Sequence, residues 1–294
     1  MQNFEGKVAF ITGGASGIGL GMARNFIAEG MKVVIADWND DHLDAVRKEF
    51  AGSNAVHFIK LDVSDREQMK KAAAETLSVF GKVHVVCNNA GVGGGGAADD
   101  PEFDDWDRAL SINLGGVVNG VKVFAPIIKE QGEGGHIVNT SSMAGIVPLP
   151  GLAAYSTAKY AVRGYTESLR LALAPHGIGV SCLYPGAVKT ALVPAPEDDS
   201  DAPEGDAGEF LKKLWEAMRK AMSPDEMGAA VVNGIRENRP HILTHGEFLQ
   251  EVMKRNREME AAFMDMGEIP EARSEFEKTR NDMVDGLMNL PVKD

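Results

Sequence analysis

A chain of 294 residues with 44% hydrophobic and 25% charged side chains can bury a sizeable core, as one large domain or two small ones. Its net charge of −13 argues against nucleic acid or an anionic membrane as the main partner, because both bind basic surfaces. Cys87 and Cys182 lie inside apolar runs, and no Cys/His cluster has metal-ligand spacing. No apolar run reaches the roughly 18 residues of a membrane span, and no signal peptide is evident, so we expect a cytoplasmic protein. Because no ligand cluster is evident, we also expect no bound metal.

Short apolar runs alternate with longer amphipathic stretches from Lys7 to Tyr184. The runs are rich in Val and Ile, which is typical of strands buried on both faces of a parallel sheet. They lie at 8–12, 32–37, 56–62, 83–91, 136–142 and 178–186, and a last strand is expected at 241–246. Helical patterns lie at 19–29, 40–50, 65–80, 103–129 and 155–175. Asp40 and Ser64 are expected to be N-caps of two of these helices.

This alternation predicts an α/β fold: a Rossmann-type, doubly wound parallel sheet with helices on both faces. In such sheets a ligand binds beyond the carboxyl ends of the strands. Residues 194–209 hold seven acids, three prolines and no base, and residues 210–222 have a helical pattern. We therefore expect a loop and lid at about 187–225 that closes over a site.

Residues 247–294 are predicted to form a helical C-terminal extension. One apolar stripe in it consists of Phe248, Leu249, Val252, Met253, Met259, Ala262 and Phe263, and a second consists of Phe276, Met283, Leu287 and Leu290. The extension can cover a pocket, pack on a neighbouring subunit or remain a free helical tail. The sequence leaves these three roles open.

Residues 8–26 contain a strand, a glycine-rich turn and the beginning of a helix. Gly13, Gly17 and Gly19 allow a tight turn, a close approach of the backbone to a pyrophosphate, and close packing of the helix on the strand. The free N–H groups and the positive dipole end of the helix then face the phosphates. A glycine-rich stretch alone is weak evidence, but its place between an N-terminal strand and a helix fits a dinucleotide site.

Asp37 ends the next strand, 18 residues after Gly19. A carboxylate at that place can accept hydrogen bonds from the adenosine ribose and repel the 2′-phosphate of NADP. Neither Trp38 nor Ser16 offers a positive charge to such a phosphate. The sequence therefore favours NAD as the cofactor, and a solvent-facing aspartate at a strand end is the alternative.

Tyr155 and Lys159 are four residues apart and share a face of a helix. A phenol has a reference pKa near 10, and a nearby ammonium together with a positive nicotinamide ring favours the phenolate. Such a tyrosine can exchange a proton with a carbonyl or an alcohol as a hydride moves. Alone, this pair is usually an ordinary surface pair, but Ser141 and Ser142 end a strand shortly before it, where a hydroxyl can hold the substrate oxygen.

At this point the sequence resembles the short-chain dehydrogenase/reductase family, in its branch of chains of about this size, with a C-terminal extension. The matching features occur in the family's order and spacing over roughly residues 5–190. They are TGGASGIG (12–19), Asp37, Asp62-Val63, NNAG (88–91), Asn113, Ser142, Tyr155, Lys159 and PGAVKT (185–190).

The resemblance implies a role for each of these residues, within a dinucleotide-binding and catalytic domain at 1–246. Tyr155 is the expected acid/base, and Ser142 positions the substrate oxygen. Lys159 lowers the pKa of Tyr155 and binds the nicotinamide ribose, and Asn113 holds a water in a proton relay. The cofactor is expected to contact Gly13, Ser16, Gly17, Ile18, Gly19, Asp37, Asp62, Val63, Asn89, Ala90, Gly91, Tyr155, Lys159, Pro185, Gly186, Val188 and Thr190.

The substrate pocket is expected to be apolar. Its predicted walls are Met143, Ile146, Val147, Leu149, Leu152, Leu192 and Val193, with Phe210, Leu214 and Trp215 as a lid. Apart from Lys189, no Arg or Lys is placed to clamp a carboxylate or phosphate, which favours a bulky, uncharged secondary alcohol or ketone. Longer family members with similar extensions act on aromatic or polycyclic alcohols. The run Gly93 to Gly96 departs from the family and leaves the shape of one wall open.

The residues support three classes of function. The first is an NAD-dependent short-chain alcohol dehydrogenase or ketone reductase. The second is a non-catalytic NAD-binding sensor or scaffold on the same fold, and the third is an interaction protein that works through its acidic loop and C-terminal helices. The four residues Asn113, Ser142, Tyr155 and Lys159 together favour the enzyme. The resemblance implies a homodimer or homotetramer, and the physiological direction stays open.

Overall fold

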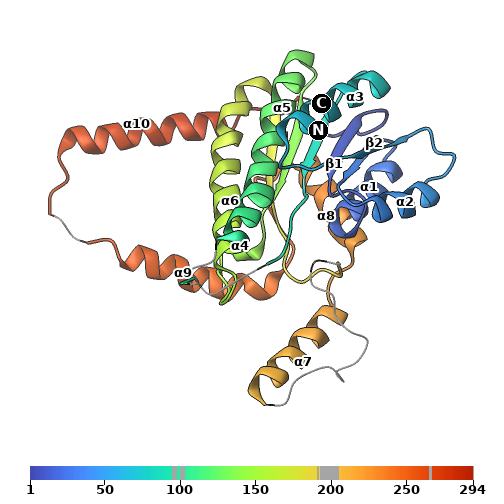
Figure 1. Cartoon of the computed structure of the whole chain (residues 1–294). Helices are drawn as coiled ribbons and strands as arrows, with labels where there is room; N and C mark the ends of the chain where they lie inside the picture. Colours follow the sequence, from blue (N-terminus) through green and yellow to red (C-terminus); the bar gives the residue numbers. More distant parts are fainter. Residues whose placement is uncertain (95–97, 100–102, 191, 193–204, 265–266, 294) are drawn as a thin grey trace.

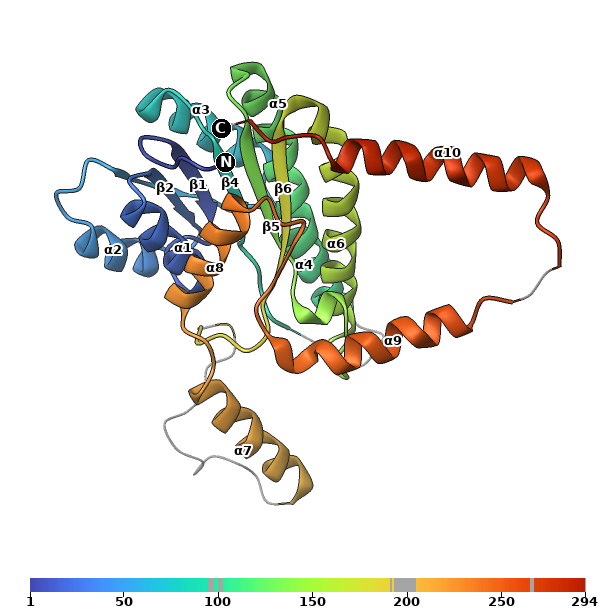
Figure 2. The same cartoon turned by 180° about the vertical axis from the view of Figure 1, so that it is seen from behind.

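The computed structural model of the chain describes residues 1–94, 98–99, 103–190, 192, 205–264 and 267–293. These residues contain a parallel sheet of seven strands in the order β3-β2-β1-β4-β5-β6-β7, with helices on both of its faces (Figures 1 and 2). The strands are β1 (Val8–Thr12), β2 (Lys32–Asp37), β3 (Val56–Lys60), β4 (Val85–Asn88), β5 (Gly135–Thr140), β6 (Ile178–Tyr184) and β7 (His241–Leu243). The predicted doubly wound α/β fold is confirmed.

The helices between the strands largely follow the expected pattern. They are α1 (Gly17–Ala28), α2 (Asp40–Glu49), α3 (Arg66–Phe80), α4 (Asp104–Ala109), α5 (Gly116–Gln131), α6 (Ala153–Leu173), α7 (Asp206–Arg219) and α8 (Pro224–Arg236). The stretch predicted as one helix at 103–129 is divided, because a π-helical turn (Leu110–Gly115) separates α4 from α5. The sequence analysis assigned no helix to α8.

Successive side chains of the strands point to opposite faces of the sheet, and both faces are buried. In β1, Ala9 and Ile11 pack in the cluster that contains residues of α1 and α8, whereas Phe10 packs in the cluster that contains residues of α5. The ring centroids of Phe10 and Phe124 are 4.4 Å apart. Burial on both faces explains why these strands are continuous apolar runs in the sequence.

Two helix N-caps lie one residue away from the predicted positions. The cap of α2 is Asn39, whose side chain accepts from the His42 N–H, and Asp40 is the first helical residue. The cap of α3 is Asp65, whose carboxylate accepts from two backbone N–H groups, whereas Ser64 precedes it. In each case a neighbouring side chain of the same capping type has the extended backbone that a cap requires.

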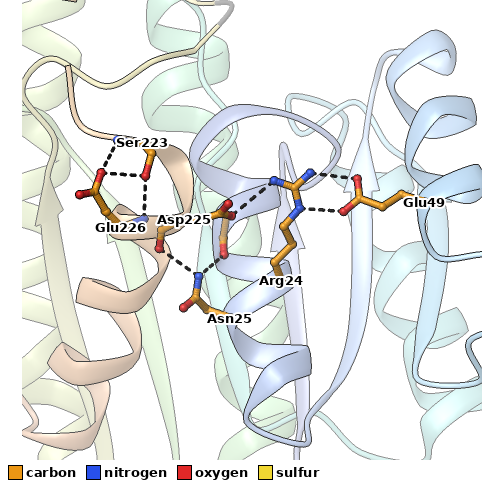
Figure 3. A network of polar contacts seen from close by, with 7 residues as sticks. Arg24, Asn25, Glu49, Ser223, Asp225 and Glu226 are labelled. Atoms are coloured by element: carbon orange, nitrogen blue, oxygen red, sulfur yellow. Dashed lines mark hydrogen bonds and ion pairs between the residues drawn. The ribbon is translucent and has the colours of Figure 1, made fainter. Parts of the chain in front are cut away.

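Helix α8 lies directly against α1, and glycines on both helices bring the two backbones together. A Cβ atom at Gly21 would lie 1.9 Å from the carbonyl oxygen of Pro224, and one at Gly228 would lie 2.2 Å from the oxygen of Gly21. Figure 3 shows the polar contacts at this junction, where Arg24 of α1 joins Glu49 of α2 to Asp225 of α8. The junction fixes α1, whose N-terminus lies at the glycine-rich turn.

One helical stretch among the described residues, Asp104–Gln131, is long and apolar enough to cross a membrane, and half of its apolar window is buried inside the protein. In α5, Phe124 and Ile128 are fully buried in the cluster that contains residues of β1, β4 and β5. The stretch therefore has the packing of a core helix in a protein with a buried sheet.

The last described part of the chain contains α9 (Leu249–Ala261) and α10 (Glu271–Met288). Both project from the body past α6, as the two opposite views show (Figures 1 and 2). The chain then returns to the body, where the Lys293 N–H donates to the Gly177 carbonyl. The N- and C-terminal ends lie beside each other in both views.

Candidate active site

A cleft with a volume of about 520 Å³ lies at the carboxyl ends of the strands, where the fold predicts a ligand site. Segments that follow β1, β2, β4, β5 and β6 contribute to it. Its lining residues are Gly13, Ser16, Gly17, Ile18, Asp37, Trp38, His42, Asn89, Ala90, Gly91, Val92, Gly93, Gly94, Arg108, Asn113, Thr140, Ser141, Ser142, Tyr155, Lys159, Pro185, Gly186, Ala187, Val188, Thr190, Leu192 and Met218.

The glycine-rich turn has no room for side chains. Gly13 has a φ of +61°, and a Cβ atom there would lie 2.9 Å from the Cα of Ala90. A Cβ atom at Gly19 would lie 2.0 Å from the carbonyl oxygen of Gly13. The N-cap residue of α1, Ser16, makes no side-chain cap. The first turn of α1 therefore has N–H groups available for an anion, and the turn fits a pyrophosphate.

Asp37 lies at the end of β2, where its buried carboxylate holds two turns in place. One carboxylate oxygen accepts from the Ala15 N–H at 3.1 Å, and the other accepts from the Asn39 N–H at 3.1 Å. Asp37 and Trp38 both line the cleft. The carboxylate therefore fixes the glycine-rich turn as well as presenting a negative charge to the cleft.

The segment after β4 is attached to the glycine-rich turn through Thr12. The Thr12 hydroxyl accepts from the Asn89 N–H at 2.9 Å and from the Ala90 N–H at 3.0 Å. The Asn89 side chain donates to the Thr12 carbonyl at 3.2 Å. These bonds align the NNAG segment along the floor of the cleft.

The predicted catalytic residues come together at one end of the cleft. Lys159 is buried, and its ammonium donates to the Thr140 carbonyl at 3.0 Å and lies 5.5 Å from the centre of the Tyr155 ring. The Ser142 hydroxyl accepts from the Ala144 N–H at 3.1 Å, which caps a short 3-10 turn. The Ser141 hydroxyl donates to the Lys159 carbonyl at 2.7 Å, so it is bonded within the protein, and Ser142 is the better placed of the two serines to hold a substrate oxygen.

Asn113 lies fully buried in the π-helical turn between α4 and α5. Its side-chain oxygen accepts from the Val92 N–H at 3.0 Å, and its amide donates to the Val92 carbonyl at 3.1 Å. A Cβ atom at Gly91 would lie 2.7 Å from that oxygen and 3.5 Å from the Lys159 ammonium. Asn113 and Lys159 thus flank Gly91, and π-helical turns are frequent at functional sites.

Burial affects the pKa values of the two central groups in opposite directions. Burial raises the pKa of Tyr155 above its usual value, while a hydrogen bond with Ser142 acts to lower it. Burial lowers the pKa of Lys159 to about 8. Lys159 is expected from the sequence to lower the pKa of Tyr155, but the desolvation of the buried phenol is the larger effect.

The buried Lys159 makes a testable contribution to stability. Its pKa in the unfolded chain is the ordinary 10.5, so between pH 8 and 10.5 the unfolded chain binds more protons and stability rises with pH. We expect the unfolding free energy of the wild type, relative to Lys159→Met, to increase by about 1.6 kcal/mol from pH 8 to 9.5. Urea unfolding at both pH values measures this. The same comparison with the exposed Lys122→Met should give no increase, and a flat Lys159 difference would contradict the argument.

Most of the residues expected to contact a cofactor line the cleft. Gly19 does not, because it packs behind Gly13. Asp62 and Val63 also lie outside the lining: Asp62 accepts from the Ser64 N–H at the beginning of α3, and Val63 is buried. The sequence analysis did not assign Trp38, His42, Val92 or Met218 to the site, and they line the cleft.

The predicted apolar walls lie only partly at the cleft. Leu192 lines it, whereas Met143 is buried in a cluster with Cys182 and Tyr184. Leu214 and Trp215 do not line the cleft; α7 projects away from the body and contributes only Met218 (Figure 2). Val193, the acidic segment 194–204 and Gly95 and Gly96 lie outside the described residues, as does the side chain of Phe210.

The sequence indicated no Arg or Lys other than Lys189 placed to clamp a carboxylate or phosphate, and the structure adds one arginine to the residues at the cleft. Arg108 lines the cleft together with Gly93 and Gly94. It lies on α4, one turn before the π-helical segment that contains Asn113. The sequence analysis missed it because only the three-dimensional arrangement of α4 brings this exposed arginine to the opening of the cleft.

Within the described ranges, no group of three His, Cys, Asp or Glu side chains is placed to hold a metal ion. Both cysteines are free and buried, as expected for core thiols.

Proteins of known sequence share this arrangement over most of the chain. Over 205 residues, 69% of this chain and 78% of the relative, it is 39% identical to the 3-alpha-(or 20-beta)-hydroxysteroid dehydrogenase of Mycobacterium tuberculosis. Over 255 residues, 84% of this chain and 83% of the relative, it is 34% identical to the C alpha-dehydrogenase of Sphingobium sp. SYK-6.

Solved structures show the same similarity over most of the chain. The apo form of LigO from Sphingobium sp. SYK-6 superposes with a TM-score of 0.78 at 38% identity, covering 96% of this chain and 98% of that one. A short-chain dehydrogenase/reductase from Burkholderia phymatum in complex with NAD superposes with a TM-score of 0.79 at 35% identity, covering 92% of this chain and all of that one. The family model for short chain dehydrogenases matches residues 7–201, which include the glycine-rich turn and the residues from Asn113 to Lys159. The chain is therefore an oxidoreductase of the short-chain dehydrogenase family.

Proposed function

We propose that this protein is an NAD(H)-dependent oxidoreductase that interconverts a secondary alcohol and a ketone, with Tyr155 as its general acid and base. The observation that carries the proposal is the convergence of Asn113, Ser142, Tyr155 and Lys159 on the cleft that also contains the glycine-rich turn. A sensor or scaffold on this fold would need the turn but not these four side chains together.

The chemistry of the four side chains supports a separate role for each of them in the reaction. When bound, NAD(H) supplies or accepts the hydride. The Tyr155 hydroxyl gives a proton to the substrate oxygen during reduction and takes it back during oxidation. The Ser142 hydroxyl, held by the Ala144 N–H, keeps that oxygen beside the phenol. The Lys159 ammonium favours the phenolate, and Asn113 holds a water through which the proton reaches solvent.

We infer a preference for NAD over NADP from the buried carboxylate of Asp37. It faces the cleft beside Trp38, and neither residue offers a positive charge to a 2′-phosphate. The family member from B. phymatum, which was solved with NAD, is consistent with this preference.

We infer that the substrate is bulky and mainly hydrophobic, either aromatic or polycyclic. One positively charged side chain, Arg108, lies near it. Leu192, Val188 and Met218 supply apolar surface to the cleft. The relative named as a hydroxysteroid dehydrogenase supports a polycyclic alcohol. Arg108 at the opening adds a partner for a polar or anionic substituent of the substrate.

We also propose that the protein is cytoplasmic and works as a homodimer or homotetramer. The acidic composition and the two reduced, buried cysteines are consistent with that compartment. The sequence resemblance supports the assembly.

The cofactor preference can be tested with a change of charge at constant shape. Asp37→Asn keeps an acceptor for the Ala15 N–H but removes the negative charge that repels a 2′-phosphate. We expect the wild type to bind NADH at least tenfold more tightly than NADPH, and Asp37→Asn to reduce that ratio severalfold, in fluorescence titrations. Asp41→Asn, which removes the same charge outside the cleft, should leave the ratio unchanged. Tighter binding of NADPH by the wild type would refute this role of Asp37.

The reaction class is tested with a panel of aromatic, steroid and aliphatic secondary alcohols and NAD, followed by the absorbance of the reduced cofactor. Turnover on the bulky alcohols supports the enzyme. NADH binding without turnover on any member of the panel, in both directions, would favour the sensor or scaffold.

A further inference from the structure

The chain exposes more surface than a compact monomer of its mass. Its solvent-accessible surface is 15609 Å² for 31.5 kDa. The scaling of surface with mass gives about 12,100 Å² for a compact monomer of that size, so about 3,500 Å² is in excess. A stable protein–protein interface of standard size buries only about 800 Å² on each partner. The excess is large enough for an extensive interface.

Helices α9 and α10, which we call the C-terminal arm, contribute to this exposed surface. Neither helix has a buried residue. Of the sixteen large hydrophobic side chains that are exposed among the described residues, nine lie between Leu249 and Leu290. The arm is attached to the body at both ends. Phe248 and Val252 pack against the cluster of Met143 and Tyr184, and Lys293 bonds to Gly177.

Along α10 the exposed apolar residues form a single ridge. Phe276 and Met283 lie within α10, seven residues apart, and are 65% and 61% exposed, and Ile269 continues the spacing just before the helix. Leu290, after the end of the helix, lies at the body, where it lines a small cavity with Arg170 and Ala174. Residues seven apart lie on one face of a helix. Ala272, Thr279 and Gly286 repeat with the same spacing beside the ridge, and a Cβ atom at Gly286 would meet nothing within 4 Å. Large side chains alternating with small ones allow a second helix to approach closely.

A helix that projects into solvent with an exposed apolar face, as α10 does, is expected to pack that face against another surface. Isolated helices of this length are marginally stable in water, and most helices in proteins are stabilised by packing of an apolar face. Among the described residues, the main contacts of α10 within its own chain are those with α6 and the turn Ala174–His176. The surface that packs on the ridge must therefore belong to another molecule.

The charges beside the ridge indicate which molecule packs on it. In the seven-residue repeat, Arg273 and Arg280 lie along one side of the ridge, and Glu275 and Asp282 lie along the other. Two copies of α10 packed ridge to ridge in the same direction bring the bases of each against the acids of the other, as in a parallel coiled coil. The surface is therefore complementary to itself.

We propose that the C-terminal arm is an assembly arm, and that the ridge of α10 is buried against the same ridge of a second copy of this chain. This inference deepens the proposed homo-oligomer by naming its interface. The excess of accessible surface, the exposed ridge and the self-complementary charges all support a second copy of this chain as the molecule that packs on the ridge.

Two double variants test the ridge by mass in solution. Phe276→Asp with Met283→Asp places two charges on the ridge, and Ser274→Asp with Asn281→Asp places the same charges on the opposite face of α10. By light scattering after gel filtration, we expect the wild type at twice 31.5 kDa or a higher multiple, and the ridge variant at half the wild-type mass. The opposite-face variant should keep the wild-type mass. A monomeric wild type, or a ridge variant that keeps its mass, would overturn the proposal.

Folding and catalysis are separate readouts in this experiment. None of the four substituted residues is buried, so far-UV circular dichroism and NADH binding should be retained in both variants. The mass result therefore stands even if the proposed dehydrogenase activity fails.

Cross-linking tests the pairing itself. Same-direction packing places Met283 beside its counterpart in the second copy, so Met283→Cys should form a disulfide-linked dimer under mild oxidation. Asn281→Cys on the opposite face should not, and the native cysteines are buried. Equal cross-linking of both variants, or none at Met283→Cys, would refute ridge-to-ridge packing.

Discussion

Tyr155→Phe is expected to lower kcat by about 10²–10⁴-fold, because general acid–base catalysis by one side chain typically contributes that much. The substitution removes only the hydroxyl and keeps the ring that packs near the Lys159 ammonium. Binding of NADH, measured by fluorescence, should therefore change little. The measurement is steady-state turnover on the best alcohol of the panel.

A matched control is available one turn along the same helix. Tyr160 is 38% exposed, does not line the cleft, and donates its hydroxyl proton to the Ile146 carbonyl. Tyr160→Phe removes the same atom and should leave kcat within a factor of about two, since surface changes of this kind have small effects. If the two variants lose activity equally, Tyr155 is not the proton donor.

Gly21→Ala is expected to destabilise the protein by about 1–3 kcal/mol or more, because overpacking forces a rigid backbone to move. The added Cβ atom would lie 1.9 Å from the Pro224 carbonyl oxygen. That atom belongs to the backbone of α8 and cannot rotate away, so α1 and α8 must separate. Urea or thermal unfolding measures the loss. NADH binding should weaken as well, since α1 begins at the glycine-rich turn.

Gly164→Ala is the control for this substitution. Gly164 lies in α6, where a Cβ atom would meet nothing within 4 Å. Alanine is the better helix former by roughly 0.5–1 kcal/mol, so this variant should be as stable as the wild type or more stable. An equal loss of stability in both variants would show that the close approach of α1 and α8 does not matter.

The strands, and the meeting of Ser142, Tyr155 and Lys159 at the cleft, could be predicted because their signals are local. A strand buried on both faces is a continuous apolar run, and the spacing from Ser142 to Lys159 lies within one connection and one helix. Helix α8 was missed although its beginning carries a strong signal: Ser223 and Glu226 form a capping box with Pro224 at the first helical position. Its apolar face contains glycine and alanine, which gives a weak periodic pattern.

The features that the sequence did not reveal depend on contacts between distant segments. Arg108 reaches the cleft only through the position of α4. The π-helical turn that holds Asn113 is one extra residue in a long helical pattern, which periodicity does not resolve. The direction of α7 depends equally on its surroundings, since its amphipathic pattern fits a lid and a projecting helix alike.

The neighbouring ends of the chain have a practical consequence for the order of the polypeptide. Met1 is buried and Lys293 returns to Gly177, so the two ends are held on the same side of the body (Figure 1). A circularly permuted gene could join them through a short linker and open the chain at the exposed turn around Gly52, between α2 and β3. The C-terminal arm would then be an internal hairpin, with both of its attachments to the body preserved.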